Sequence, residues 1–426
     1  MKKLFFLTMV LMLILSGCGG NNASSGSNTG GSASSSGNDA AKSSAEPSSA
    51  PKVAEVKIGG LYPLSGGLAS EGQDMANAVQ MAVDEVNAAG GIKSLGGAKV
   101  VLDKADSEGK PQKGVSEVQR LDRDGVVGIL GTYASGVALP ATQEAEKAKI
   151  PFVVDIAVVN EITERGFKYT FRIQPPAKIM ANNFLSYISM LNDKSSVKLS
   201  TAVLAHEDSV FGSSIAALIK ENAAKSGIKT LEDIPYPAST PDMSSVVNKI
   251  KSLNPDIVVT TGYLRDGTML IKGLHDANVK PKSIIGVANG AFSNQQFITQ
   301  QKDINQNIMD VNYTINPKSD LANQVKEKYK NQFQKDMSAN AAYSYTAAQV
   351  LLDAIERAAS ADRDKIREAL TQTDFSKHIL PQSPIKFDAT GQNVNAQAVL
   401  NQIFDGKSQV VFPDDYKTAN PVYPMP

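Results

Sequence analysis

The chain has 426 residues, which is too long for one typical domain and suits two lobes with additional segments. Hydrophobic residues make up 42% and charged residues 20%, a composition that excludes a disordered or fibrous protein. With 43 basic and 43 acidic residues the formal net charge is zero, so no nucleic-acid partner is expected.

The first residues predict an export signal. Lys2 and Lys3 precede an apolar run over 4–15 that is short for a membrane span, and Leu-Ser-Gly-Cys follows at 15–18. This ending resembles a bacterial lipobox, which implies a signal peptide over 1–17 and lipid on Cys18. A plain signal peptide with an incidental cysteine is the alternative. Cys18 is the only cysteine, so an intrachain disulfide is excluded.

Residues 18–52 contain Ser, Gly and Asn in abundance and no large apolar side chain. Such a segment cannot offset the entropy lost on ordering, so we expect a disordered tether. A flexible coil of this length reaches about 30 Å. We therefore predict an exported bacterial protein that is held at the outer face of the cytoplasmic membrane through lipidated Cys18.

From Val53 onwards, apolar strand-like runs alternate with helical patterns. This rhythm predicts a parallel sheet that is covered on both faces. A capping box of Ser70 and Gln73 is expected at the start of the first helix. The expected strands lie at 56–64, 98–106, 126–130 and 151–156, and the expected helices at 70–87, 113–122 and 139–148.

The same rhythm then begins again, which predicts a second α/β lobe without a close sequence repeat. A helix is expected to open at Thr240-Pro241, with proline at its first position. The end of the chain alternates like a hairpin, with turns at 389–392 and 405–406. The other expected strands lie at 197–207, 228–236, 255–263, 283–288 and 307–315, and the helices at 209–226, 264–277, 321–334, 341–359 and 362–370, with a short segment ending near 301.

Ligands of open parallel sheets lie beyond the carboxyl ends of the strands, so the turns there are the candidate site. The glycine-rich stretch 59–67 fits neither G-x-G-x-x-G nor a P-loop, which excludes a nucleotide site of those types. The three histidines are far apart in sequence and have no cysteine partners. We expect no metal, no cofactor and no catalytic group. The turns lie at 61–67, 131–137, 155–160, 207–212, 261–266 and 288–292.

Several segments together resemble the substrate-binding proteins of ATP-driven importers, specifically the branched-chain amino-acid (Leu/Ile/Val) type with the type I periplasmic-binding-protein fold. The resemblance extends from about Val53 to the C-terminus. It is carried by the order and spacing of 58–92, 151–175, 206–214, 242–263, 344–360 and 384–393.

The resemblance implies two doubly wound parallel-sheet lobes joined by a three-strand hinge. The first lobe would comprise 53–172 and about 314–378, and the second about 173–313 and about 379–426. The implied protein is a monomeric receptor, not an enzyme, that captures a small solute by hinge closure and delivers it to an ABC permease with its ATPase. A sensory lipoprotein that signals to a membrane partner and a surface hydrolase are the alternatives.

The resemblance also implies ligand contacts. Ser135 would hydrogen-bond a carboxylate, with N–H groups such as that of Gly136 as further donors at a helix N-terminus. Phe211 and Tyr263 would be aromatic contacts from the second lobe, and Tyr62 and Leu64 would close over the ligand.

Two positions depart from the family pattern. Val158, after Ala157, stands where the leucine-type site has threonine. Ala288, followed by Asn289, stands where that site has an acid that neutralises the ligand's ammonium. A buried ammonium without a counter-charge is costly, so another acid serves or the ligand has no amine. The acids considered are Asp155, Glu207 and Asp266. The solute is expected to be an amino acid or close analogue, with an aromatic or aliphatic carboxylate and a neutral amide-like solute as alternatives.

Overall fold

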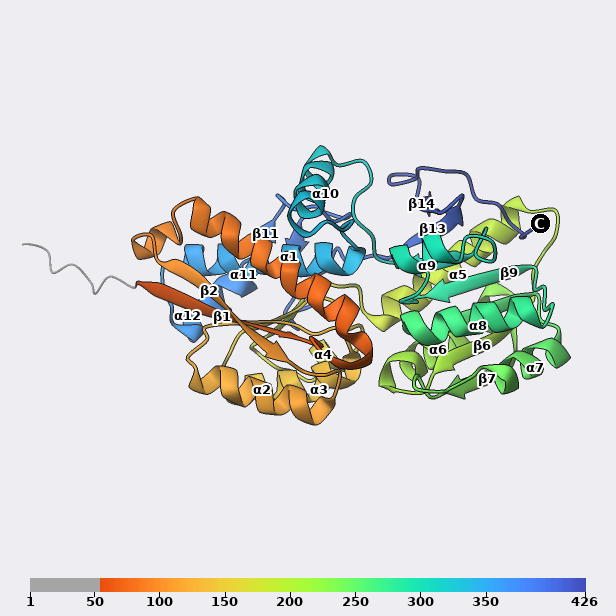
Figure 1. Ribbon diagram of the computed structural model, residues 1–426, viewed down its shortest axis with the longest axis horizontal. Helices are drawn as coiled ribbons and strands as arrows, with labels where there is room; N and C mark the ends of the chain where they lie inside the picture. Colours follow the sequence, from red (N-terminus) through yellow and green to blue (C-terminus); the bar gives the residue numbers. More distant parts are fainter. Residues whose placement is uncertain (1–53) are drawn as a thin grey trace, which may run out of the picture. The chain divides into compact units, whose positions relative to one another are not determined.

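The computed structural model describes residues 54–426, and the predicted signal peptide, Cys18 and the tether lie outside these residues. The described strands form two large sheets and a two-stranded ribbon (Figure 1). Among the described residues, no helix combines the length and the apolar character that crossing a bilayer requires.

The first lobe is built on five parallel strands in the order β2-β1-β3-β4-β5. Helices α1 and α11 pack on one face of this sheet and α2 and α3 on the other (Figure 1). Because both faces are covered, every residue of β3 and β4 is buried. The elements are β1 (Glu55–Tyr62), α1 (Ala69–Ala88), β2 (Lys99–Asp106), α2 (Pro111–Arg123), β3 (Ile129–Gly131), α3 (Ser135–Lys147), β4 (Phe152–Val154), α4 (Glu161–Glu164), β5 (Thr170–Arg172), α10 (Asp320–Phe333), α11 (Ala339–Ala358) and α12 (Arg363–Thr371).

The second lobe is built on seven strands in the order β14-β13-β10-β9-β8-β6-β7. Five of them are parallel, and the hairpin β13–β14 adds two antiparallel strands beside β10. Helices α5 and α6 pack together, as do α7 and α8. The elements are α5 (Ala177–Lys194), β6 (Thr201–Glu207), α6 (Val210–Asn222), β7 (Lys229–Tyr236), α7 (Ser244–Leu253), β8 (Ile257–Thr261), α8 (Leu264–Asp276), β9 (Ser283–Val287), α9 (Gln295–Gln300), β10 (Met309–Asn312), β13 (Val399–Phe404) and β14 (Lys407–Phe412).

The chain passes between the two lobes three times: after β5, after β10 and after the ribbon of β11 (Asp374–Phe375) and β12 (Ile385–Lys386). Hydrogen bonds join these three crossings. Arg172 N donates to Gly391 O over 2.8 Å, and Asn316 N donates to Ile379 O over 2.9 Å. Helices α10 and α11 return to pack on α1. The two doubly wound lobes confirm the predicted fold class.

Two local predictions at helix starts were wrong. The capping box is not formed, since Leu68 is the N-cap of α1 and Gln73 Nε2 instead donates to Leu64 O over 3.0 Å. No helix opens at 240–241, because Asp242 accepts a hydrogen bond from Ser244 N over 2.7 Å and α7 begins only at Ser244.

The helix expected from 139 begins four residues earlier, at Ser135. Pro140 therefore lies inside α3 and leaves the carbonyl of Gly136 without its usual N–H partner. The loss of this hydrogen bond is tolerated because it falls in the first turns of α3. The early start matters for the site, since it places Ser135 at the N-terminus of α3.

Candidate functional site

The turns at the carboxyl ends of six strands line one cavity, with about 330 Å³ of empty space that includes open solvent. Both lobes contribute, and each lining residue follows closely on a strand or opens the next helix. The first lobe supplies Tyr133, Ser135, Ile156 and Val158, the second lobe Phe211, Gly262, Tyr263, Ala288 and Gly290, and the crossing after β10 supplies Tyr313.

Ser135 is a buried polar side chain at this cavity that is held by a hydrogen bond. It is 1% exposed, and its Oγ accepts a hydrogen bond from Val158 N over 3.2 Å. The hydroxyl proton stays available to a ligand. Ala134, the N-cap of α3, has no side chain that could cap the first N–H groups of the helix. The hydroxyl of Ser135 and the N-terminus of α3 together favour an anionic group of a ligand.

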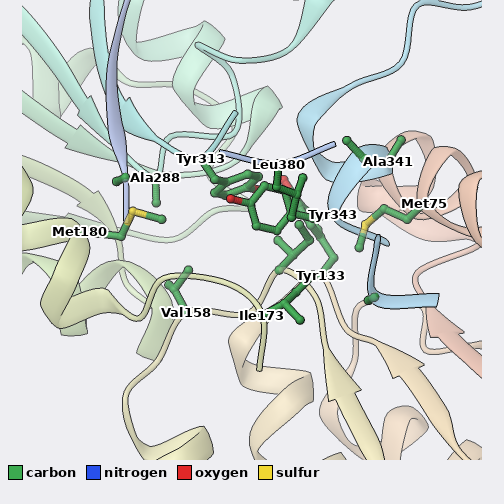
Figure 2. Close-up of a cluster of buried hydrophobic side chains, with 14 of the residues drawn as sticks. Met75, Tyr133, Val158, Ile173, Met180, Ala288, Tyr313, Ala341, Tyr343 and Leu380 are labelled. Carbon is green, nitrogen blue, oxygen red and sulfur yellow. The ribbon is translucent and has the colours of Figure 1, made fainter. Parts of the chain in front are cut away.

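Aromatic rings from both lobes meet across the cavity. The ring centroid of Tyr263 lies 5.3 Å from that of Phe211 and 5.7 Å from that of Tyr133. Tyr313 lies against Tyr343 in the cluster of Figure 2, with centroids 4.9 Å apart. Burial raises the pKa of Tyr133, Tyr263 and Tyr313, so their hydroxyls are neutral donors at neutral pH. The arrangement suits a solute with an apolar body.

Half of the residues expected to contact a ligand line this cavity: Ser135, Val158, Phe211, Tyr263 and Ala288. Figure 2 labels Val158 and Ala288, which come from opposite lobes. Ala288 has a φ of 54°, in the left-handed region that alanine seldom adopts, and this conformation sets the direction of the turn after β9.

The other expected residues lie elsewhere. Tyr62 is fully buried inside the first lobe, and its hydroxyl donates to Asp155 Oδ2 over 2.7 Å. Leu64 is half-buried, with its N–H donating to Asp106 Oδ1 over 2.8 Å. Ala157 belongs to the apolar cluster under α2 and α3. These three positions lie at or after the ends of strands, but none of them lines the cavity.

Asn289 and Gly136 also lie outside the cavity lining. Asn289 is buried, and its Oδ1 accepts from Ala291 N over 2.9 Å, so the amide shapes the turn after β9. Gly136 lines a wider hollow, here called the outer hollow, which adjoins the cavity at Tyr263 and has about 1320 Å³ of empty space. Residues 67–71, 109–111, 134–137, 207–209, 237–239 and 263–266 contribute to its walls.

Five lining residues were not named as ligand contacts from the sequence: Tyr133, Ile156, Gly262, Gly290 and Tyr313. All but Tyr313 lie in the turns predicted to form the site, and for two of them the sequence also indicated the direction of the side chain. Tyr133 and Ile156 lie two positions before Ser135 and Val158, and extended segments direct alternate side chains to one side. Gly290 had no such signal. A Cβ built on it would lie 2.9 Å from the hydroxyl of Tyr133 and 3.3 Å from Cα of Tyr263.

None of the three acids considered as a counter-charge lines the cavity. Asp155 is held by Tyr62 and by Ser344, whose Oγ donates over 2.6 Å. Glu207 caps α6 by accepting from Gly212 N over 2.6 Å. Each of these carboxylates therefore has a structural partner already.

Asp266 is the third acid, and it is committed in the same way. Its Oδ1 accepts from Tyr263 N over 3.0 Å and its Oδ2 from the hydroxyl of Tyr236 over 3.1 Å. Burial raises the pKa of Asp266 to about 7 and that of Asp155 to about 6, so each charge is already poorly solvated.

The comparisons with known proteins agree with this architecture. A protein from Brucella abortus named Leu/Ile/Val-binding protein homolog 8 is 32% identical over 383 residues, covering 86% of this chain and 93% of its own length. A leucine-binding protein of Thermotoga maritima has a TM-score of 0.73 at 22% identity, covering 84% of this chain and 99% of that structure.

A solute-binding protein of an ABC transporter from R. palustris, solved with benzoate, has a TM-score of 0.72 at 20% identity, covering 84% of this chain and 95% of that structure. The family described as periplasmic binding protein matches residues 55–407. The chain therefore belongs to the periplasmic binding protein family, as the resemblance of its sequence predicted.

Proposed function

We propose that this protein is an extracytoplasmic solute receptor that binds one small solute in the cavity between its lobes and delivers it to an ABC permease. The observation that carries the proposal is the lining of the cavity, to which the strand-end turns of both lobes contribute. A ligand that contacts both lobes stabilises the arrangement in which they meet over one in which they are apart. Capture then requires no bond to be made or broken.

The proposed motion is hinge closure about the three crossings between the lobes. We assign 53–172 and about 314–378 to one moving body, and about 173–313 and about 379–426 to the other. Two observations support this division. Apart from β11 and β12, which pair with each other, the strands of each body form one sheet, and the helices of 320–371 pack with the first sheet rather than the second.

We propose that Ser135 and the first N–H groups of α3 bind a carboxylate of the solute. The apolar body of the solute would then lie among Val158, Ala288, Phe211 and Tyr263. The relatives support solutes of this kind: the names of two refer to leucine or to Leu/Ile/Val, and another holds benzoate. All of these solutes combine a carboxylate with an apolar body.

The finer localisation is also a proposal. We infer that residues 1–17 are removed on export and that lipid on Cys18 holds the receptor at the outer face of the cytoplasmic membrane as a monomer. The lipobox-like sequence at 15–18 supports this. Replacement of Cys18 by alanine should release the protein from the membrane fraction, and retention there would contradict the anchor.

The proposed function is tested by calorimetry on the purified protein with a panel of amino acids and amine-free carboxylates, combined with small-angle scattering. We expect saturable binding of one class of solute and a smaller radius of gyration in its presence. A protein that binds no member of the panel and keeps the same radius of gyration would contradict the proposal.

A further inference from the structure

Glu71 is a buried carboxylate beside the cavity that has no cationic partner. It lies in the first turn of α1 and is 6% exposed. Among the described residues, no Lys, Arg or His nitrogen lies within ion-pair distance of it. The nearby Lys335 is paired with Asp74, over 3.0 Å. Burial raises the pKa of Glu71, and its own backbone N–H and the charge of Lys335 offset this only in part.

Glu71 does not line the cavity itself, but it lines two hollows that adjoin the cavity. It lines the outer hollow, which shares Tyr263 with the cavity. It also lines a smaller hollow of about 290 Å³, which shares Gly290 with the cavity. Met75, one turn further along α1, is drawn in the same cluster as Tyr133 and Tyr313 (Figure 2). Glu71 and Met75 therefore lie on the buried face of α1.

One oxygen of Glu71 contacts the second lobe. Asn294 Nδ2 donates to Glu71 Oε1 over 3.3 Å, and Asn294 Oδ1 accepts from Gln296 N at the start of α9. The second bond fixes the orientation of the Asn294 amide, so that its NH₂ group faces Glu71. This is a neutral donor and does not neutralise the carboxylate. Glu71 Oε2 keeps its capacity to accept from a ligand.

The groups in and beside the cavity favour ligand groups of opposite charge. The hydroxyl of Ser135 and the N-terminus of α3 favour an anion, whereas Glu71 favours a cation. A zwitterionic α-amino acid carries one anionic and one cationic group, so its two charges match these two kinds of group in sign. An amine-free carboxylate would leave Glu71 without a counter-charge.

We propose that Glu71 is the counter-charge for an ammonium group of the solute, on the first lobe instead of at position 288 of the second lobe, where this chain has alanine. The solute class is then an α-amino acid with an apolar side chain. This inference rests on the proposed function of the protein as a solute receptor.

The test is calorimetry with matched pairs of solutes that differ only in the amine: leucine with 4-methylpentanoate, and phenylalanine with 3-phenylpropanoate. The wild-type protein should bind an amino acid of one pair more tightly than its amine-free partner. Glu71→Gln keeps the size of the side chain and an acceptor for Asn294 but removes the charge. It should weaken binding of that amino acid by about tenfold to a hundredfold and leave the amine-free acid within about twofold.

Two variants separate this role from others. Asp84→Asn removes one negative charge from an exposed position on the same helix, and it should preserve the preference for the amine. Asn294→Ser keeps a cap for α9 but removes the donor to Glu71. It should weaken both members of a pair alike, because only the contact between the lobes is lost.

Thermal unfolding of each variant shows whether it is folded. The inference is overturned if the folded Glu71→Gln variant keeps the wild-type preference for the amine. It is also overturned if the wild-type protein binds only amine-free acids such as benzoate and closes on them, in which case the proposed function stands. A wild-type protein that neither binds any of these solutes nor closes would overturn the proposed function, and this inference with it.

Discussion

The backbone N–H of Val158 donates to Oγ of Ser135 over 3.2 Å, and this bond ties the turn after β4 to the first residue of α3. It orients a hydroxyl at the cavity whose own proton is still free to be donated. The two residues are 23 positions apart in sequence, and the neighbouring parallel strands β3 and β4 bring them together.

Replacement of Ser135 by alanine should weaken binding of a carboxylate solute by about 1–3 kcal/mol, because a buried hydrogen bond to a charged group is lost. Calorimetry would measure the change. Ser116→Ala is the matched control, since its hydroxyl lies on the exposed surface of α2 and donates only to Lys113 O. An affinity equal to that of the wild-type protein would show that the anionic group binds elsewhere.

Gly290 of the second lobe lies beside Tyr133 of the first lobe at the site. Gly290→Ala would place a methyl group 2.9 Å from the hydroxyl of Tyr133, so either this side chain or the lobes would have to shift. We expect the dissociation constant to rise about tenfold or more, in keeping with the cost of overpacking. Gly67→Ala is a suitable control because its Cβ would meet no atom within 4 Å. Equal affinities of the two variants would argue against a contact between the lobes at Gly290.

Arg172 links β5 to the third crossing, and we expect it to be required for a stable hinge. It is 1% exposed, and its guanidinium donates to Gln392 Oε1 over 2.7 Å and to Val159 O over 2.6 Å. Burial lowers its pKa to about 9. Arg172→Lys replaces the several donors of the guanidinium by one ammonium nitrogen and leaves buried acceptors unpaired. This should lower the unfolding free energy by about 2–4 kcal/mol.

Urea denaturation would measure this loss. Arg123→Lys, on the exposed end of α2, provides the comparison and should change the midpoint little. If Arg172→Lys unfolds at the same urea concentration as the wild-type protein, the guanidinium network does not stabilise the hinge.

The sequence predicts the lobes and the strand-end turns well because both depend on local patterns. Apolar runs separated by helical stripes determine a parallel sheet, and the site follows at its carboxyl edge. The turns that contain Ser135 and Tyr263 were located on this basis, and the resemblance to the family indicated these two residues within them. Packing decides which side of a turn faces the cavity. The sequence pattern does not show this packing, so Tyr62 was predicted as a ligand contact although it does not line the cavity. The hydroxyl of Tyr62 meets Asp155, a residue 93 positions away.

Glu71 lies near the site, but the sequence pattern did not predict this position. An acid in the first turn of a helix is typical of a solvated position that complements the helix dipole. Its hydrogen bond with Asn294, 223 positions later, places Glu71 between the lobes, where it is buried. A contact of this kind leaves no periodic signal in the sequence.

We expect the stability of the folded protein to depend on pH through the carboxyl group of Asp310. Asp310 is 2% exposed on β10 and accepts from Asn312 Nδ2 over 2.8 Å, and burial raises its pKa from 3.8 to about 7. The unfolded chain loses this proton near pH 4, whereas the folded protein keeps it to near pH 7. The folded state thus binds more protons in this window, and its stability falls as the pH rises.

Asp310→Asn removes this titration while keeping a side chain of the same size. Its unfolding free energy relative to the wild-type protein should therefore increase from pH 5 to pH 8, by up to about 2 kcal/mol. Taking this difference cancels the opposite contribution of His378, whose pKa burial lowers to about 4. The new amide can rearrange Asn312, and this changes the unfolding free energy by the same amount at every pH. Denaturation at several pH values would check this, and a difference that stays constant from pH 5 to pH 8 would show that the carboxyl of Asp310 is already ionised at the lower pH.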